Sequence, residues 1–264
     1  MPVATSSATG SGFSKVAAVT LSFWIIKILC TTLGETAGDA VTMGDAAVKF
    51  GGLGYAWGTA LYAAIFLAAV IAQIVAKKFH PLIYWLTIIA TTTVGTTLAD
   101  LVDRDGSLGY MWGSVLLLGL LLASLFVWFR AAGSIAVGSV DSPKSEIFYW
   151  VTIMFSQTLG TALGDWLSDT MGLGYLGSVY VFGGALVLVA LLFFFTKISR
   201  TALFWAAFIL TRPLGAVSGD LFDKPVTKGG FAISRFEVSG VLIVLIVLAI
   251  LFFPHKAAPR EAAH

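Results

Sequence analysis

The stretch WIIKILCTTLGETAGD, residues 24–39, recurs in recognisable form three more times, beginning at Trp85, Trp150 and Trp205. In every copy a glycine stands ten residues after the tryptophan, an aspartate stands 15 residues after it, and a small residue precedes the aspartate. The glycines are Gly34, Gly95, Gly160 and Gly215, and the aspartates are Asp39, Asp100, Asp165 and Asp220. Matching offsets in four places indicate a fold made of four tandem repeats.

The composition places these repeats in a membrane. Of the 264 residues, 58% are hydrophobic and 11% are charged, against roughly 25% charged residues in soluble domains, and the mean hydropathy is +0.93. These values exclude a soluble globular protein. A spanning helix needs about 20 apolar residues, so the chain has room for eight.

Each repeat reads as a hairpin of two spans, in which the motif helix is followed by a plain apolar helix. Because two spans return the chain to its starting side, the four repeats run parallel. We therefore expect an all-α, pseudo-symmetric bundle of eight transmembrane helices in one domain, residues 16–253. The expected repeats cover about 16–76, 81–129, 147–195 and 201–253, between a disordered tail (1–15) and a cytoplasmic tail (254–264).

Basic residues predict the orientation of this bundle. Nine Lys or Arg residues lie on the side of the chain ends, and five lie on the side of the repeat aspartates. Because cytoplasmic loops carry the excess of Lys and Arg, both termini are expected in the cytoplasm. The repeat tryptophans would then lie near the inner membrane interface as anchoring rings.

A polar stripe follows one face of each motif helix, at positions three, seven, 11 and 15 residues after the tryptophan. Within a span, an ionisable group is costly and is by default a functional candidate. The candidate substrate-binding residues are Thr31, Glu35, Asp39, Thr92, Thr96, Asp100, Gln157, Thr161, Asp165 and Asp220. Lys27 and Arg212 are candidates for balancing the Glu35 charge.

The types of donor atom narrow the ligand class. Oxygen ligands suit hard cations such as Mg²⁺, Ca²⁺ or Mn²⁺, so the four aspartates are candidate metal ligands at an acidic outer vestibule. One cysteine and three histidines do not provide a soft-metal cluster, and no cofactor motif is present. The basic residues form no continuous stripe, so no nucleic-acid partner is expected.

The four-unit pattern, Trp-x9-Gly-x3-[Gly/Ala]-Asp, resembles a family of bacterial multi-pass proteins with tandem repeats of unknown function, called membrane-anchored proteins. The motif tryptophans, glycines and aspartates carry the resemblance, which extends from about Trp24 to Phe253. It implies the repeat fold and a place in the bacterial inner membrane, and it implies no activity.

The sequence thus predicts an inner-membrane transporter of small hard cations, possibly proton-coupled, and not an enzyme. Its expected partners are the lipid bilayer and a small inorganic cation. Two other interpretations stay open. One is a carrier for a small organic or anionic solute held by Lys27 and Arg212. The other is a non-transporting scaffold or sensor subunit, whose polar stripes only join helices.

Overall fold

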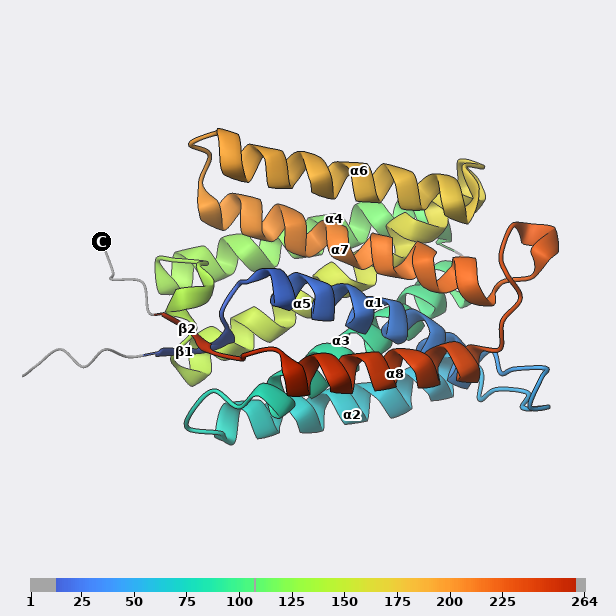
Figure 1. Ribbon diagram of the computed structural model, residues 1–264, viewed down its shortest axis with the longest axis horizontal. Helices are drawn as coiled ribbons and strands as arrows, with labels where there is room; N and C mark the ends of the chain where they lie inside the picture. The colour runs from blue at the N-terminus through green and yellow to red at the C-terminus, as the bar shows by residue number, and fades with distance from the viewer. Residues whose placement is uncertain (1–12, 107, 260–264) are drawn as a thin grey trace, which may run out of the picture.

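The computed structural model describes residues 13–106 and 108–259, which form eight α-helices and one small sheet (Figure 1). The helices are α1 (Leu21–Thr42), α2 (Tyr55–Val75), α3 (Pro81–Asp100), α4 (Gly109–Ala132), α5 (Pro143–Asp165), α6 (Gly174–Phe195), α7 (Arg200–Asp223) and α8 (Arg235–Phe252). Single π-helical turns, η1 (Leu101–Asp105) and η3 (Trp166–Thr170), continue α3 and α5, and short 3-10 turns, η2 (Val137–Ser139) and η4 (Val226–Lys228), lie in loops. The prediction of an all-α bundle of eight helices is confirmed.

The two ends of the described chain meet in an antiparallel pair, β1 (Phe13–Ala17) with β2 (Ala257–Pro259). The backbone N–H of Lys15 also donates to the carbonyl of Val140, 3.1 Å away, which ties β1 to the segment before α5. The disordered tail expected at residues 1–15 differs here, because residues 13–15 belong to β1. The rest of that tail, and residues 260–264 of the expected cytoplasmic tail, lie outside the described residues.

The four motif helices begin with local stop signals that the sequence supplies. The Thr20 hydroxyl accepts a hydrogen bond from the Phe23 N–H at the start of α1, and Ser199 caps α7 in the same way. Ser142 caps α5 and is followed by Pro143 in the first turn. Because side-chain caps satisfy orphan N–H groups and proline lacks one, each of these residues fixes where its helix begins.

The motif helices form an inner ring in the order α1, α3, α5, α7, and α7 packs back against α1. The second helix of each repeat lies against the motif helix of the following repeat, as α2 on α3, α4 on α5 and α6 on α7. Helix α8 completes the pattern by packing on α1. The two helices of one repeat make few contacts with each other, so the packed unit crosses the repeat boundary.

The repeat glycines make the ring possible. A Cβ on Gly34 would overlap the Thr92 side chain, and one on Gly215 would overlap Thr31. Gly95 faces Gln157 and Gly160 faces Arg212 in the same manner. In each case the glycine of one repeat meets the residue seven positions after the tryptophan of the next repeat, so one helix contact occurs four times around the ring.

The outer helices present apolar side chains outward, as a protein in lipid requires. Phe194 on α6 is 74% exposed and Phe252 at the end of α8 is 79% exposed. By length and composition, six helices can cross a membrane, namely α2, α3 with η1, α4, α6, α7 and α8. Helices α1 and α5 have 22 and 23 residues and carry polar side chains at their ring contacts. Since α5 packs between α3 and α7, we infer that the inner ring crosses as a unit.

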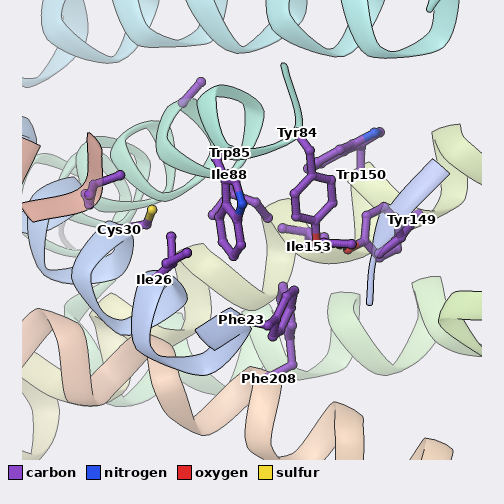
Figure 2. Packing of buried hydrophobic residues seen from close by; sticks show 14 of the residues in the cluster. Phe23, Ile26, Cys30, Tyr84, Trp85, Ile88, Tyr149, Trp150, Ile153 and Phe208 are labelled. Atoms are coloured by element: carbon purple, nitrogen blue, oxygen red, sulfur yellow. Dashed lines mark hydrogen bonds between the residues drawn. The ribbon is translucent and has the colours of Figure 1, made fainter. Parts of the chain in front are cut away.

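The expected role of the repeat tryptophans as interfacial anchors is wrong for three of them. Trp85, Trp150 and Trp205 are each at most 4% exposed. They pack within a layer of aromatic rings inside the bundle, which Figure 2 shows in part. The ring contacts among α1, α3, α5 and α7 leave these side chains no access to the interface.

An aromatic residue immediately precedes each repeat tryptophan, and these four residues are Phe23, Tyr84, Tyr149 and Phe204. The hydroxyls of Tyr84 and Tyr149 lie 2.8 Å apart and share a hydrogen bond, and Figure 2 shows the two side chains pointing toward each other. Phe23 packs on Trp85 with a centroid distance of 5.5 Å. The inner ring is therefore filled with aromatic side chains at the end near β1 and β2.

Candidate functional site

The four repeat aspartates lie where the inner helices end, away from the β1–β2 sheet (Figure 1). Asp39, Asp100, Asp165 and Asp220 are each at most 2% exposed. The repeat thus brings them to one level, as the sequence predicts. Their burial differs from the open acidic vestibule that we expected, because their own cationic neighbours cover them.

Two cationic side chains each bridge a pair of these aspartates. The Lys224 ammonium lies 2.5 Å from an Asp39 oxygen and 3.0 Å from an Asp220 oxygen. On the opposite side of the ring, Arg104 lies 2.6 Å from Asp100 and 3.0 Å from Asp165.

The site therefore has a pseudo-twofold arrangement within the fourfold ring, because only the second and fourth repeats supply a bridge. Sequence reasoning counted Lys224 and Arg104 only as loop charges and missed this role. The signal was available, since each stands four residues, about one helical turn, after its repeat aspartate.

The cation at Lys224 is held in its charged form by its surroundings. Burial of the ammonium acts against its charge, but the carboxylates of Asp220, Asp39 and Asp223 raise the pKa of Lys224 well above its ordinary value. Arg235, from the start of α8, adds a second cation beside this group. It pairs with Asp223 at 2.8 Å and approaches Asp39 at 3.8 Å.

The loop after α1 is fastened to α8 by Asp45. Its carboxylate accepts hydrogen bonds from the Ser234 hydroxyl and the backbone N–H of Arg235, at 2.8 and 2.7 Å, and one from the N–H of Ala47, at 2.7 Å. Burial acts to raise the pKa of Asp45, but these hydrogen bonds hold it below its ordinary value. Asp45 is therefore part of the loop structure.

One helical turn below the aspartates, Arg212 connects all four inner helices. Its guanidinium Nη2 lies 2.9 Å from Glu35 on α1 and 2.6 Å from the Thr96 hydroxyl on α3, and it also contacts the Thr161 hydroxyl on α5. Arg212 is 0% exposed and Glu35 is 2% exposed. The predicted charge balance between Glu35 and Arg212 is thus present as a buried ion pair.

The remaining polar stripe residues split into two groups. Thr92 donates to the carbonyl of Cys30 at 3.1 Å, Thr96 to that of Gly34 at 3.0 Å, and Thr31 to that of Thr211 at 3.2 Å. These hydroxyls join neighbouring helices. Gln157 differs, because its buried amide has no hydrogen-bond partner within residues 13–106 and 108–259.

Lys27 lies apart from the other ionisable groups. Its ammonium donates to the Phe208 carbonyl at 3.1 Å and the Thr211 hydroxyl at 2.6 Å, and it lies 3.7 Å from the Phe208 ring centroid. No carboxylate lies within 4.0 Å of it in the described part of the chain. Lys27 and Arg212 therefore do not share an acid, contrary to one arrangement that the sequence allowed.

Three carboxylates converge between α1 and α7. One oxygen from each of Glu35, Asp39 and Asp220 lies within 4.8 Å of the others, and all three residues are buried. Buried carboxylate oxygens are the ligands that hard divalent cations prefer. Asp100 and Asp165 belong to the other side of the ring, so the four aspartates do not form a single set of metal ligands.

The polar groups thus occupy one half of the ring and the aromatic layer occupies the other half. The aspartate level is followed by the Arg212–Glu35 pair, then by Thr31, Thr92 and Gln157. Below them lie Ile88, Ile153 and Phe208, each 0% exposed. An ion that entered from the aspartate end would meet oxygen ligands first and the aromatic layer last.

Comparisons with known proteins agree with the repeat organisation. A family model described as Repeat of Unknown Function (DUF347) matches the chain four times, over residues 22–79, 83–134, 148–199 and 203–256. No curated protein and no solved structure matches the chain. The four matches fall on the four helix pairs described above.

Proposed function

Since the chain belongs to the DUF347 repeat family, whose description assigns no activity, we propose a function from the site itself, namely transport of small hard cations rather than catalysis. The observation that carries this proposal is the convergence of Glu35, Asp39 and Asp220 within 4.8 Å in the interior of a membrane bundle. The proposed location is the bacterial cytoplasmic membrane, with both termini inside and the aspartate end outside.

The ammonium of Lys224 supports this reading because it marks where a cation is held. It lies between Asp39 and Asp220, at 2.5 and 3.0 Å from their oxygens. A divalent cation would compete with Lys224 for the same oxygens, and its double charge favours it at a cluster of carboxylates. Lys224 follows the last residue of α7, where η4 and the adjoining loop give it a place to move.

The layers of the ring define the sequence of events in transport. A cation from the aspartate side displaces Lys224 and is bound by Asp39, Asp220 and Glu35, and Arg212 then stays with Thr96 and Thr161. Release on the other side requires the aromatic rings around Tyr84 and Tyr149 to separate, as in alternating access. Proton coupling belongs to this proposal, since a carboxylate released by a cation can bind a proton.

The test is cation flux in proteoliposomes loaded with a fluorescent indicator, using Mn²⁺, Ca²⁺, Mg²⁺ and Na⁺ in turn. We expect flux of at least one divalent cation in the wild type and its loss in Asp39→Asn and Asp220→Asn. Glu237→Gln is the matched control, because Glu237 is an exposed acid at the same end of the bundle. Absence of flux of all four ions in the folded wild type would refute the proposal.

A non-transporting scaffold is the second candidate, and the hydrogen bonds of Thr92, Thr96 and Thr31 to carbonyls of neighbouring helices favour it. On this reading the ion pairs only lock the ring. The flux experiment separates the two functions, because a scaffold moves no ion while its aspartate variants still lose stability. A carrier of anionic solutes would instead need Lys27 or Arg212 to line a cavity, and neither lines the two cavities of the described chain that we discuss.

A further inference from the structure

At the opposite end from the aspartates, four lysines surround a hollow of about 540 Å³, lined by Ser14, Lys15, Lys77, Lys78, Phe79, Lys256 and Ala257. We call it the lysine hollow. Its residues come from β1, from the link between α2 and α3, and from the segment that leads from α8 into β2. Residues that are distant along the chain therefore share one cationic site.

The backbone around the lysine hollow is fixed by hydrogen bonds. The Gln73 side-chain amide donates to the Lys15 carbonyl at 3.0 Å, and the Ala18 N–H donates to the Lys256 carbonyl at 2.9 Å. The Lys15 ammonium is bound to Glu146 at 2.7 Å and to the Ile74 carbonyl at 3.0 Å. The shape of the hollow is thus built into the pairing of the two chain ends.

The other three lysines carry unbalanced charge. Lys77, Lys78 and Lys256 are exposed, and no carboxylate lies within 4.0 Å of their ammonium groups in the part of the chain that the structure describes. Since Lys15 is neutralised by Glu146, the hollow has three ammonium groups free for an anion. An anion with several oxygens, such as a phosphate ester, matches this set of donors.

The surroundings of the hollow select the kind of phosphate. Lys77 and Lys78 directly follow α2, whose last residue Val75 is 72% exposed. Lys256 follows α8, whose final residues Leu251 and Phe252 are 72% and 79% exposed. The hollow therefore opens beside apolar helix surfaces that face lipid. A headgroup in the hollow could keep its acyl chains on α2 and α8.

We propose that the lysine hollow binds the headgroup of an anionic phospholipid, whose chains lie along the membrane-facing ends of α2 and α8. Basic clusters where helices leave the bilayer attract anionic lipids, at about 1 kcal/mol for each Lys near the surface. Bound there, the lipid holds together the strands β1 and β2 and the link between α2 and α3. This proposal is independent of the transport proposal.

The experiment is native mass spectrometry of the full chain released from nanodiscs that contain equal amounts of phosphatidylglycerol and phosphatidylcholine. We expect wild type to retain phosphatidylglycerol selectively. In the triple variant Lys77→Gln, Lys78→Gln, Lys256→Gln, affinity should fall on the order of a hundredfold, and in Lys256→Gln alone about fivefold. Arg130→Gln, Lys144→Gln, Lys197→Gln removes three exposed charges at the same end and should bind as wild type does.

Three results would overturn the proposal. The first is equal retention of the two lipids by wild type, and the second is undiminished selectivity in the triple variant. The third comes from adding inorganic phosphate alone: displacement of phosphatidylglycerol at concentrations near that of the lipid would identify a free-phosphate site. We expect no such displacement, because inorganic phosphate lacks the acyl chains that rest on the apolar helices.

Discussion

The buried pair of Arg212 and Glu35 should act as one unit in unfolding. Arg212→Leu removes the guanidinium that contacts Glu35, Thr96 and Thr161 and leaves a carboxylate that is 2% exposed with no cation at 2.9 Å. Removing one partner of a buried ion pair costs about 3–5 kcal/mol of unfolding free energy. Glu35→Gln leaves the guanidinium unpaired instead and should have a cost in the same range.

The double variant decides whether the pair explains these losses. Glu35→Gln with Arg212→Leu leaves no unpaired charge at this level, so its loss should be smaller than the sum of the single losses, by roughly 1–3 kcal/mol. The measurement is reversible unfolding in mixed micelles, followed by tryptophan fluorescence. If the two single losses simply add in the double variant, the charges are not coupled and the argument from the buried pair fails.

Three further predictions concern packing, loop charge and the aromatic layer. Gly34→Ala should lower the unfolding free energy by about 1–3 kcal/mol because its methyl group enters an occupied helix contact; Gly119→Ala, which has open space around it, should be neutral or slightly stabilising in the same assay. Asp45→Asn should lower the melting temperature at neutral pH, with a loss of about 1–3 kcal/mol. Because the pKa of Asp45 is depressed in the folded state, the stability it contributes is present above its ordinary pKa and disappears as pH falls through the folded value, so melting curves of variant and wild type should converge in acid; a gap that persists there would contradict this. Tyr84→Phe should cost about 1–2 kcal/mol by leaving the Tyr149 hydroxyl without its 2.8 Å partner, and an unchanged melting temperature would show that the hydroxyl pair contributes nothing.

The repeat organisation could be predicted from sequence because packing requirements recur at fixed offsets. Gly34 and its three equivalents are small because a neighbouring helix occupies the place of a side chain, and such a requirement is visible in one chain. The level of the aspartates was predictable for the same reason, since equal offsets from the tryptophan place Asp39 and Asp220 at equal depth.

The partners of the charged residues could not be predicted in the same way. Lys224 and Arg104 lie beyond the regular motif, and their bridges depend on which helices are neighbours in the ring. The order α1, α3, α5, α7 places Asp220 beside Asp39 and Asp100 beside Asp165. The burial of Trp85 and Trp150 was missed because an aromatic residue near a helix end has the same pattern in the interior and at an interface.

The packing of each outer helix on the following repeat has a consequence for how such a molecule can be divided. Each repeat exposes one contact surface that its successor covers, and the contact of α7 and α8 with α1 repeats the contacts between successive repeats. The arrangement is that of a cyclic head-to-tail tetramer whose protomers are joined covalently. A chain cut between α4 and α5 would therefore yield two fragments with complementary open ends, and each fragment could close the ring only by binding the other.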